Sequence, residues 1–348
     1  MNQKDIADRL NLSRTTVSRC FTNHPKINPE TRAKVFQLAS RLGYVYAPPR
    51  NHRTGDEKGR TVVVLVAQPL ELSHESETTR RVLVGISDRL AEEGLHLKLH
   101  REDPERFVLG SRPRRILPEL SNEGILGFIL LYPFQQESVA NLSAKFPVIT
   151  ALDDYERLEV DSVDVDAGRG ISRLMDRLAS AGHREVAFIS WRYKVATPWV
   201  ERRFGAYVEG LYRLGLSFDE SRVVNVRRVG QIEPEAVLSR AIEWVRSGVT
   251  ALVCAADHQA YPLMAGLRAA GVRVPEDVSV TGFDGVEPPS GELPLTTIRQ
   301  PFRDIGYSTV VSLLRRVSSP AAPRRHILVG GRLIEGETVC PPRTGSIT

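Results

Sequence analysis

The chain has 348 residues, of which 41% are apolar and 26% are charged. This is the composition of globular proteins rather than of disordered or membrane-bound ones. No apolar run approaches the roughly 18 residues of a membrane-spanning helix, and the opening Met-Asn-Gln-Lys-Asp is unlike a secretory signal. We therefore expect a cytoplasmic protein with several domains, because a single core rarely covers this length.

The positive charge is concentrated at one end of the chain. Residues 1–60 hold 12 Lys and Arg against 5 Asp and Glu, a net charge of +7, whereas the remainder holds 35 against 37, a net charge of −2. This asymmetry is typical of a small domain that binds a phosphate backbone and a larger body with another role. A solvated basic face would give the same count.

Three cysteines, Cys20, Cys254 and Cys340, occur without CxxC or Cys/His ligand spacing. An odd number without such spacing argues against disulfides and structural zinc. We expect buried or incidental thiols, no metal site and no cofactor.

Two short helices joined by a brief turn are predicted first. In KDIADRLNL (residues 4–12) the apolar residues recur one turn apart, and Ser13 then caps a second helix. Two helices with so short a link match a helix-turn-helix. A third helix is predicted over residues 28–43, which begin with NPE and end with Gly43. Residues 1–46 are therefore predicted to be an all-α domain.

A linker is predicted next, because residues 47–60, APPRNHRTGDEKGR, have almost no apolar side chain. From residue 61 to 348, short apolar runs alternate with helical patterns. The predicted strands are Val62–Ala67, Ile125–Tyr132, Val148–Leu152, Val186–Ser190, Ala251–Ala256 and Val278–Phe283. The predicted helices include Thr79–Glu93, Gly168–Ala181, Trp199–Leu214, Pro234–Ser247 and Gln259–Ala270.

Continuously apolar strands between amphipathic helices indicate an α/β fold with doubly wound parallel sheets. About 285 residues of this kind exceed one core, so we expect two lobes. We place the crossings between them near residues 160–166 and 285–300.

The first residues of the second helix in a helix-turn-helix face base edges in the major groove. Here they are Arg14 and Thr15. Arginine suits guanine and threonine suits several bases, while Arg19 lies one turn further along. Hydroxyls for phosphate contacts come from Ser13, Thr16 and Ser18. Ser13 is equally explained as a helix cap, and Arg14 as a solvated side chain.

Ligands of open parallel sheets bind beyond the carboxyl ends of the strands. The candidates that follow the predicted strands are Gln68, Ser73, Tyr132, Asp153, Trp191, Asp257 and Asp284. Trp199 lies in the same loop region as Trp191. Aromatic plates beside carboxylates and hydroxyls suit a sugar or polyol ring, although core packing explains both tryptophans equally well.

The stretch KDIADRLNLSRTTVSRCFTNHPKINPETRAKVFQLASRLGY resembles the DNA-binding domain of the LacI/GalR family of bacterial transcriptional regulators. Its SxxTVSR core, NPETR helix start and LGY end carry the resemblance. It implies that Arg14 and Thr15 occupy the two specificity positions, and that Arg19 closes the TVSR motif. Asn23 is a further DNA-binding candidate.

One departure from the family concerns the hinge. Members usually follow the LGY end with a hinge helix whose leucine wedges into the minor groove, but residues 46–53 read YAPPRNHR and contain no leucine. A shortened hinge helix after Pro48 stays compatible with the sequence. We expect Arg50 or Arg53 to enter a narrow minor groove instead.

The body carries the resemblance further, in AGHREVAFIS, VPEDVSVTGFDG and PLTTIRQPFRDIG. In that family the core resembles periplasmic sugar-binding proteins, and an arginine and an aspartate contact the effector. The matching positions are Arg203, within ERRFGAY, and Asp257, within CAADHQA; Ala206 replaces the expected glycine. Asp257 is equally explained as a helix cap, and Arg203 as a partner of Glu201.

Two other classes of protein share the lobes. A doubly wound enzyme, such as one that metabolises sugars, would need a phosphate loop or catalytic set, and no such motif or catalytic residue is found. A transported sugar-binding protein would need an export signal. We therefore expect a transcriptional regulator, most simply a repressor, that binds a pseudo-palindromic DNA operator as a homodimer and responds to a small sugar-like effector.

Overall fold

The computed structural model describes residues 3–10, 12–21, 27–28, 31, 34–35, 38, 61–68, 77–104, 106–108, 124–155, 157–193, 197–226 and 230–343. The chain divides into two compact units, Met1–Asp56 and Glu57–Thr348. We call the first the head and the second the body.

The head contains two short helices, α1 (Gln3–Leu10) and α2 (Arg14–Phe21), and residues 31, 34, 35 and 38 are also helical. One small apolar core joins these segments. Its buried members are Ile6, Ala7, Val17, Cys20 and Val35. The one-turn spacing of these residues in the sequence therefore gives each helix a single inward face.

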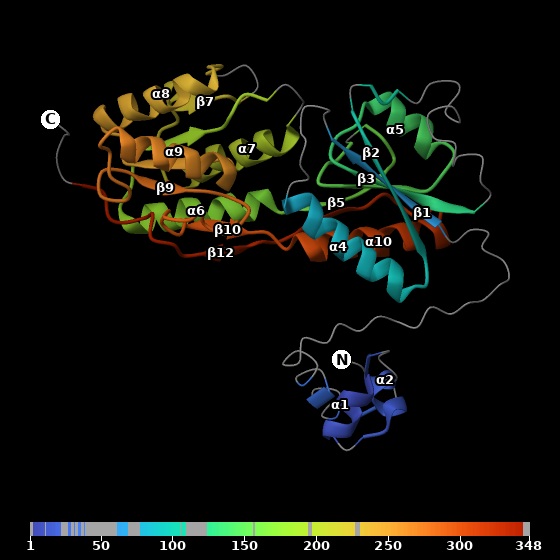
Figure 1. Cartoon of the computed structure of the whole chain (residues 1–348). Coiled ribbons are helices and arrows are strands. Elements are labelled where there is room, and N and C mark those ends of the chain that lie inside the picture. The colour runs from blue at the N-terminus through green and yellow to red at the C-terminus, as the bar shows by residue number, and fades with distance from the viewer. Residues whose placement is uncertain are drawn as a thin grey trace. The chain divides into compact units, whose positions relative to one another are not determined.

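Lobe 1 of the body is built on a six-stranded sheet in which every pairing is parallel (Figure 1). The strand order is β11-β5-β4-β3-β1-β2. The strands are β1 (Thr61–Ala67), β2 (His96–Glu102), β3 (Ile125–Leu131), β4 (Val148–Ala151), β5 (Asp161–Val165) and β11 (His326–Val329). Helices α4 (Glu77–Glu92) and α10 (Phe302–Ser318) lie side by side on one face of the sheet, and α5 (Gln136–Ser143) covers the other.

Lobe 2 is built on a four-stranded parallel sheet with the order β7-β6-β8-β9. Its strands are β6 (Val186–Ile189), β7 (Val223–Val224), β8 (Ala251–Cys254) and β9 (Ser279–Thr281), and a short 3-10 helix, Glu220–Arg222, precedes β7. Helices α6 (Ala167–Ala181) and α7 (Pro198–Arg213) pack on one face, and α8 (Pro234–Arg246) and α9 (Asp257–Ala269) on the other. The expected fold class, a helix-turn-helix head and a two-lobed α/β body, is confirmed.

The chain passes between the lobes three times. It leaves lobe 1 between β5 and α6, and returns between β10 (Thr297–Arg299) and α10. A third passage links β11 to β12 (Arg332–Ile334), which pairs antiparallel with β10. This third passage was not expected from the sequence, and residues 161–165, expected near the first crossing, form strand β5 directly before it.

All six strands expected from apolar runs are present, but β2, β5, β7 and β10 to β12 were not predicted. Strand β2 lies at the edge of its sheet, and its sequence HLKLHRE is half-exposed rather than continuously apolar. Strand β5, DSVDV, buries two acidic side chains, Asp161 and Asp164. Both strands therefore lack the continuous apolar run that guided the prediction.

Candidate functional site

In the head, Ser13 caps helix α2. Its hydroxyl oxygen accepts a hydrogen bond from the Thr16 backbone N–H at 3.0 Å and lies 2.9 Å from the Thr16 hydroxyl. This bond satisfies one of the donors that a helix N-terminus leaves unpaired. Thr15 and Arg19 are exposed on α2. The helix therefore has a fixed start and presents polar side chains to solvent.

The structure describes only some of the other DNA-binding candidates of the head. Arg14 and Ser18 belong to α2. Asn23, Arg50 and Arg53 lie outside the described residues, as does the whole expected hinge.

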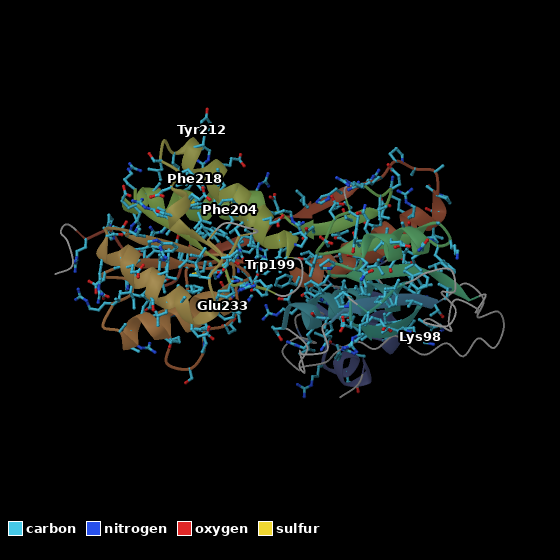
Figure 2. All side chains as sticks on the ribbon, turned by 90° about the horizontal axis from the view of Figure 1, so that it is seen from above. Lys98, Trp199, Phe204, Tyr212, Phe218 and Glu233 are labelled. Carbon is cyan, nitrogen blue, oxygen red and sulfur yellow. The ribbon has the colours of Figure 1, made fainter. Side chains whose placement is uncertain are left out.

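In the body, a cavity of about 210 Å³ lies between the two lobes. Figure 2 places Trp199 in this region between the lobes. The lining residues are Thr78, Tyr132, Leu152, Asp164, Val165, Ala167, Trp199, Arg202, Arg203, His258, Asp284 and Phe302. The walls combine aromatic rings with charged groups, the combination that binds a small polar ring.

Arg203 holds the lobe 2 wall of this cavity. One guanidinium nitrogen donates to the Ala255 carbonyl at 2.5 Å and another to the Asp284 carboxylate at 2.9 Å. The guanidinium also lies over two rings, 3.8 Å from the centre of Phe283 and 4.8 Å from that of Trp199. Burial raises the pKa of Asp284 from 3.8 to about 7, although Arg203 opposes this rise.

Asp257 is fully buried and does not line the cavity. One carboxylate oxygen accepts from the Val286 N–H at 2.8 Å, and the other accepts from the Thr297 hydroxyl at 2.7 Å. Asp257 is also not the cap of α9, because Ala256 occupies that position. In this structure, Asp257 fixes the loop after β9 and so acts on the cavity wall indirectly.

An aromatic cluster borders the cavity on lobe 2. The Tyr193 hydroxyl accepts a hydrogen bond from the Gln259 side-chain amide at 2.7 Å and lies 2.7 Å from His258 Nε2. Burial lowers the pKa of His258 to about 4, which keeps the ring neutral. Trp191 packs edge-on against His258 and Trp199 packs edge-on against Tyr193.

Lobe 1 contributes Tyr132, whose hydroxyl accepts from the Thr79 hydroxyl at 3.3 Å. Asp153 lines a neighbouring open pocket of about 660 Å³ rather than the cavity. Burial raises the pKa of Asp153 to about 6, against the attraction of Arg202. Arg202 itself lies 2.7 Å from Asp164 and 3.8 Å from Asp153.

Metal and membrane sites are not indicated in the described part of the chain. No group of three or more Cys, His, Asp and Glu side chains there is arranged to hold a metal ion. None of the described helices has the length and apolar character needed to cross a bilayer. Cys20, Cys254 and Cys340 form no disulfide.

Two family profiles match the chain. Residues 3–46 match the bacterial regulatory proteins of the lacI family, and residues 175–339 match the periplasmic binding protein-like domain. The chain is similar to LacI-family regulators in its head and to periplasmic binding protein-like domains in its body. The resemblance drawn from the sequence motifs is therefore confirmed.

Relatives of the family extend over almost the whole chain. The transcriptional regulator Rv3575c of Mycobacterium tuberculosis is 26% identical over 97% of this chain and 96% of its own length. The transcriptional repressor CytR of Escherichia coli K12 is 26% identical over 97% of this chain and 94% of its own length.

Solved structures share the fold. The regulator CelR in complex with cellobiose covers 97% of this chain and 100% of its own, with a TM-score of 0.66 and 23% identity. The lac repressor dimer bound to operator and the anti-inducer ONPF covers 98% of this chain and 99% of its own, with a TM-score of 0.64 and 21% identity. These solved LacI-family structures therefore share the fold of this chain over almost its whole length.

The effector candidates named from the sequence separate into groups. The cavity walls bring together Tyr132, Trp199, Arg203 and Asp284. Trp191, Asp153 and Asp257 lie next to these walls without lining them, and Ser73 lies outside the described residues.

Three titratable residues that line the cavity were missed. His258 follows Asp257 directly, so the rule of reading beyond strand ends would have found it if extended by one residue. Arg202 is the sequence neighbour of Arg203, but the family motif drew attention to the latter alone. Asp164 lies inside strand β5 rather than beyond its end, so no sequence rule pointed to it.

Proposed function

We propose that this chain is a sequence-specific DNA-binding transcriptional regulator, acting as a repressor and controlled by a small sugar-like effector. The proposal is carried by two features that occur in one chain. The head has a helix-turn-helix whose second helix is capped and exposes Thr15 and Arg19, and the two lobes of the body line a cavity with polar and aromatic walls. A sugar-binding protein or an enzyme needs only the second feature, whereas a regulator needs both.

In the proposed DNA complex, α2 enters the major groove, where Arg14 and Thr15 read bases. Ser13, Thr16, Ser18, Arg19 and Asn23 contact phosphates or neighbouring bases. The basic residues 1–60 supply the electrostatic attraction. We propose residues 1–46 as the DNA-binding domain and 47–60 as the hinge, with Arg50 or Arg53 in the minor groove.

In the proposed effector complex, a ring of sugar size binds between Tyr132, Trp199, Arg203 and Asp284. A cavity of about 210 Å³ suits one such ring. The solved structure of the regulator CelR is a complex with cellobiose, which supports a sugar or sugar derivative here. Trp191, Asp153, Asp257 and Ser73 are proposed as supporting residues at or behind the walls.

A homodimer is proposed because one helix-turn-helix makes few contacts, and two of them reading a pseudo-palindrome multiply specificity. Effector binding is proposed to change the lobe arrangement and so the spacing of the two heads. Since the operator is chromosomal DNA, the proposed location is the cytoplasm. No catalytic residue is proposed.

The test of this function selects DNA from a random pool and then measures affinity by fluorescence anisotropy at several salt concentrations. We expect enrichment of one pseudo-palindromic sequence, bound at least about a thousandfold more tightly than random DNA. Arg14→Ala is expected to cost about 1 to 3 kcal/mol and to relax preference at one base pair. Equal, weak binding to all sequences at low salt would refute the proposal.

The effector half is tested separately with a thermal-shift panel of sugars, sugar acids and nucleobases, because a ligand of the folded state raises the melting temperature by mass action. We expect one class to raise the melting temperature of the body and to change operator affinity. A ligand that is chemically converted would instead indicate the enzyme alternative.

A further inference from the structure

Two adjacent arginines of α7 make contacts in different lobes. The contacts of Arg203 stay in lobe 2, at the Ala255 carbonyl and Asp284. Arg202 instead reaches lobe 1, where its Nη2 lies 2.7 Å from Asp164 Oδ2 and its Nη1 lies 3.8 Å from Asp153 Oδ1. Helix α7 is therefore anchored on its own lobe by one arginine and joined to the other lobe by the next.

The Arg202 contacts form a buried charge cluster. The side chains of Asp164 and Asp153 are 4% and 5% exposed, whereas that of Arg202 is 31% exposed. Two carboxylates thus face one guanidinium, and burial raises the pKa of both acids. Removing one partner from such a cluster leaves buried charge uncompensated, whereas replacing all partners by neutral groups costs little.

Arg202 also stands between two spaces. It lines both the cavity of about 210 Å³ and the open pocket of about 660 Å³. Asp164 lines the cavity and Asp153 lines the pocket. The guanidinium and its two carboxylate contacts therefore form part of the partition that separates the two spaces.

We propose that Arg202 is the gate residue of the effector cavity: by contacting Asp164 and Asp153 it holds lobe 2 against lobe 1 and separates the cavity from the open pocket. The proposal rests on the proposed function only where it calls the ligand of the cavity an effector. The contacts of Arg202 are already present in the protein without a ligand. A single ring fits behind the closed gate. A longer ligand extends into the pocket and requires Arg202 to move.

The test needs no effector. In the full-length protein with Trp191→Phe and Trp244→Phe, the remaining Trp199 lines the cavity and reports access of acrylamide through fluorescence quenching. Arg202→Met is expected to raise the quenching constant by about fivefold. The matched control is Arg213→Met on the same helix, because Arg213 pairs with Asp176 within lobe 2, and it is expected to leave the constant unchanged.

A triple variant separates loss of the gate contacts from the effect of uncompensated charge. In Arg202→Met with Asp153→Asn and Asp164→Asn, no buried charge is left uncompensated but the contacts of Arg202 with lobe 1 are still missing, so the quenching constant is expected to stay raised. A triple variant with the quenching constant of the parent protein, or equal quenching in Arg202→Met and Arg213→Met, would overturn the gate.

Melting curves check each variant first. If Arg202→Met does not fold, Arg202→Lys replaces it, because an ammonium group keeps one contact but cannot span both carboxylates as the fork does. An intermediate rise in quenching is then expected, and an unchanged constant contradicts the gate. Failure of DNA selection or of the ligand panel would refute the proposed function and leave this quenching result standing.

Discussion

The head and the lobes place their candidate residues in opposite surroundings. In the head, Thr15 and Arg19 lie on the exposed surface of α2, above a core with five buried apolar residues among those described. In the lobes, polar side chains line a cavity, and burial changes their chemistry: the pKa of His258 falls to about 4 and that of Asp284 rises to about 7. A surface that recognises a large rigid partner needs only a fixed helix, whereas a small-ligand site needs desolvated walls.

The strongest test of this contrast is Ile6→Ala. Ile6 is fully buried in the small head core, so its truncation is expected to cost the head about 4 kcal/mol. Because head and body are separate compact units, calorimetry should show the body transition unchanged while specific DNA binding is lost. Asp8→Ala, at an exposed site on the same helix, is the control. A body transition that shifts with Ile6→Ala would contradict independent units.

A pH series sharpens the contrast for the lobes. Burial raises the pKa of Asp153 from 3.8 to about 6, so the folded protein holds this proton over a pH range where the unfolded chain has lost it. The free energy of unfolding should therefore fall as pH rises from about 4 to about 6, by about 3 kcal/mol for this group. Urea unfolding at both pH values should show that Asp153→Asn lacks this part of the pH dependence. An identical pH dependence in the parent protein and in Asp153→Asn would contradict the raised pKa.

Gly282→Ala tests the loop that Asp257 holds behind the cavity. A methyl group at Gly282 would lie 2.2 Å from Asp257 Oδ1 and 2.4 Å from Leu295 Cδ2. We expect a loss of about 2 kcal/mol in the body, measured by urea unfolding, with DNA binding by the head retained. Gly205→Ala on α7 has no neighbouring atom within 4 Å and should raise helix stability by about 1 kcal/mol. Equal effects of the two changes would contradict the tight contact at Gly282.

The smallest expected effect is that of the α2 cap. Ser13→Ala removes the acceptor of the Thr16 N–H and should cost the head about 1 kcal/mol, seen as a lower melting temperature of its transition. Ser13→Asp keeps an acceptor and should retain most of the stability. If Ser13→Ala melts like the parent protein, the serine acts only toward DNA.

The local sequence pattern was sufficient to predict elements that bury one helix face or one continuous apolar run. The continuous apolar runs located six strands, and the turn spacing located α1 and α2, because burial of those residues does not depend on distant partners. Helix α10 was not predicted, although Ile305, Thr309 and Leu313 repeat at one-turn spacing on its buried side. Reading that repeat would have found it.

The residues that line the cavity could not be predicted from the local sequence pattern alone. Positions beyond strand ends led to Tyr132, Asp284 and, through the family motif, Arg203. The same rule also led to Asp257, which the fold turns toward Val286 and Thr297 instead of the cavity. A position beyond a strand end fixes where a backbone lies but not which hydrogen-bond partners take up its side chain.

The amino-acid order by itself determined the basic head, the alternating α/β body and the resemblance to the LacI family, since each depends on residues close together in the chain. The tertiary structure alone decided that Arg202 meets Asp164 across the two lobes and that Asp257 lies behind the wall. Those contacts join residues dozens of positions apart, and their charge states follow from burial, which only the folded arrangement of both lobes defines.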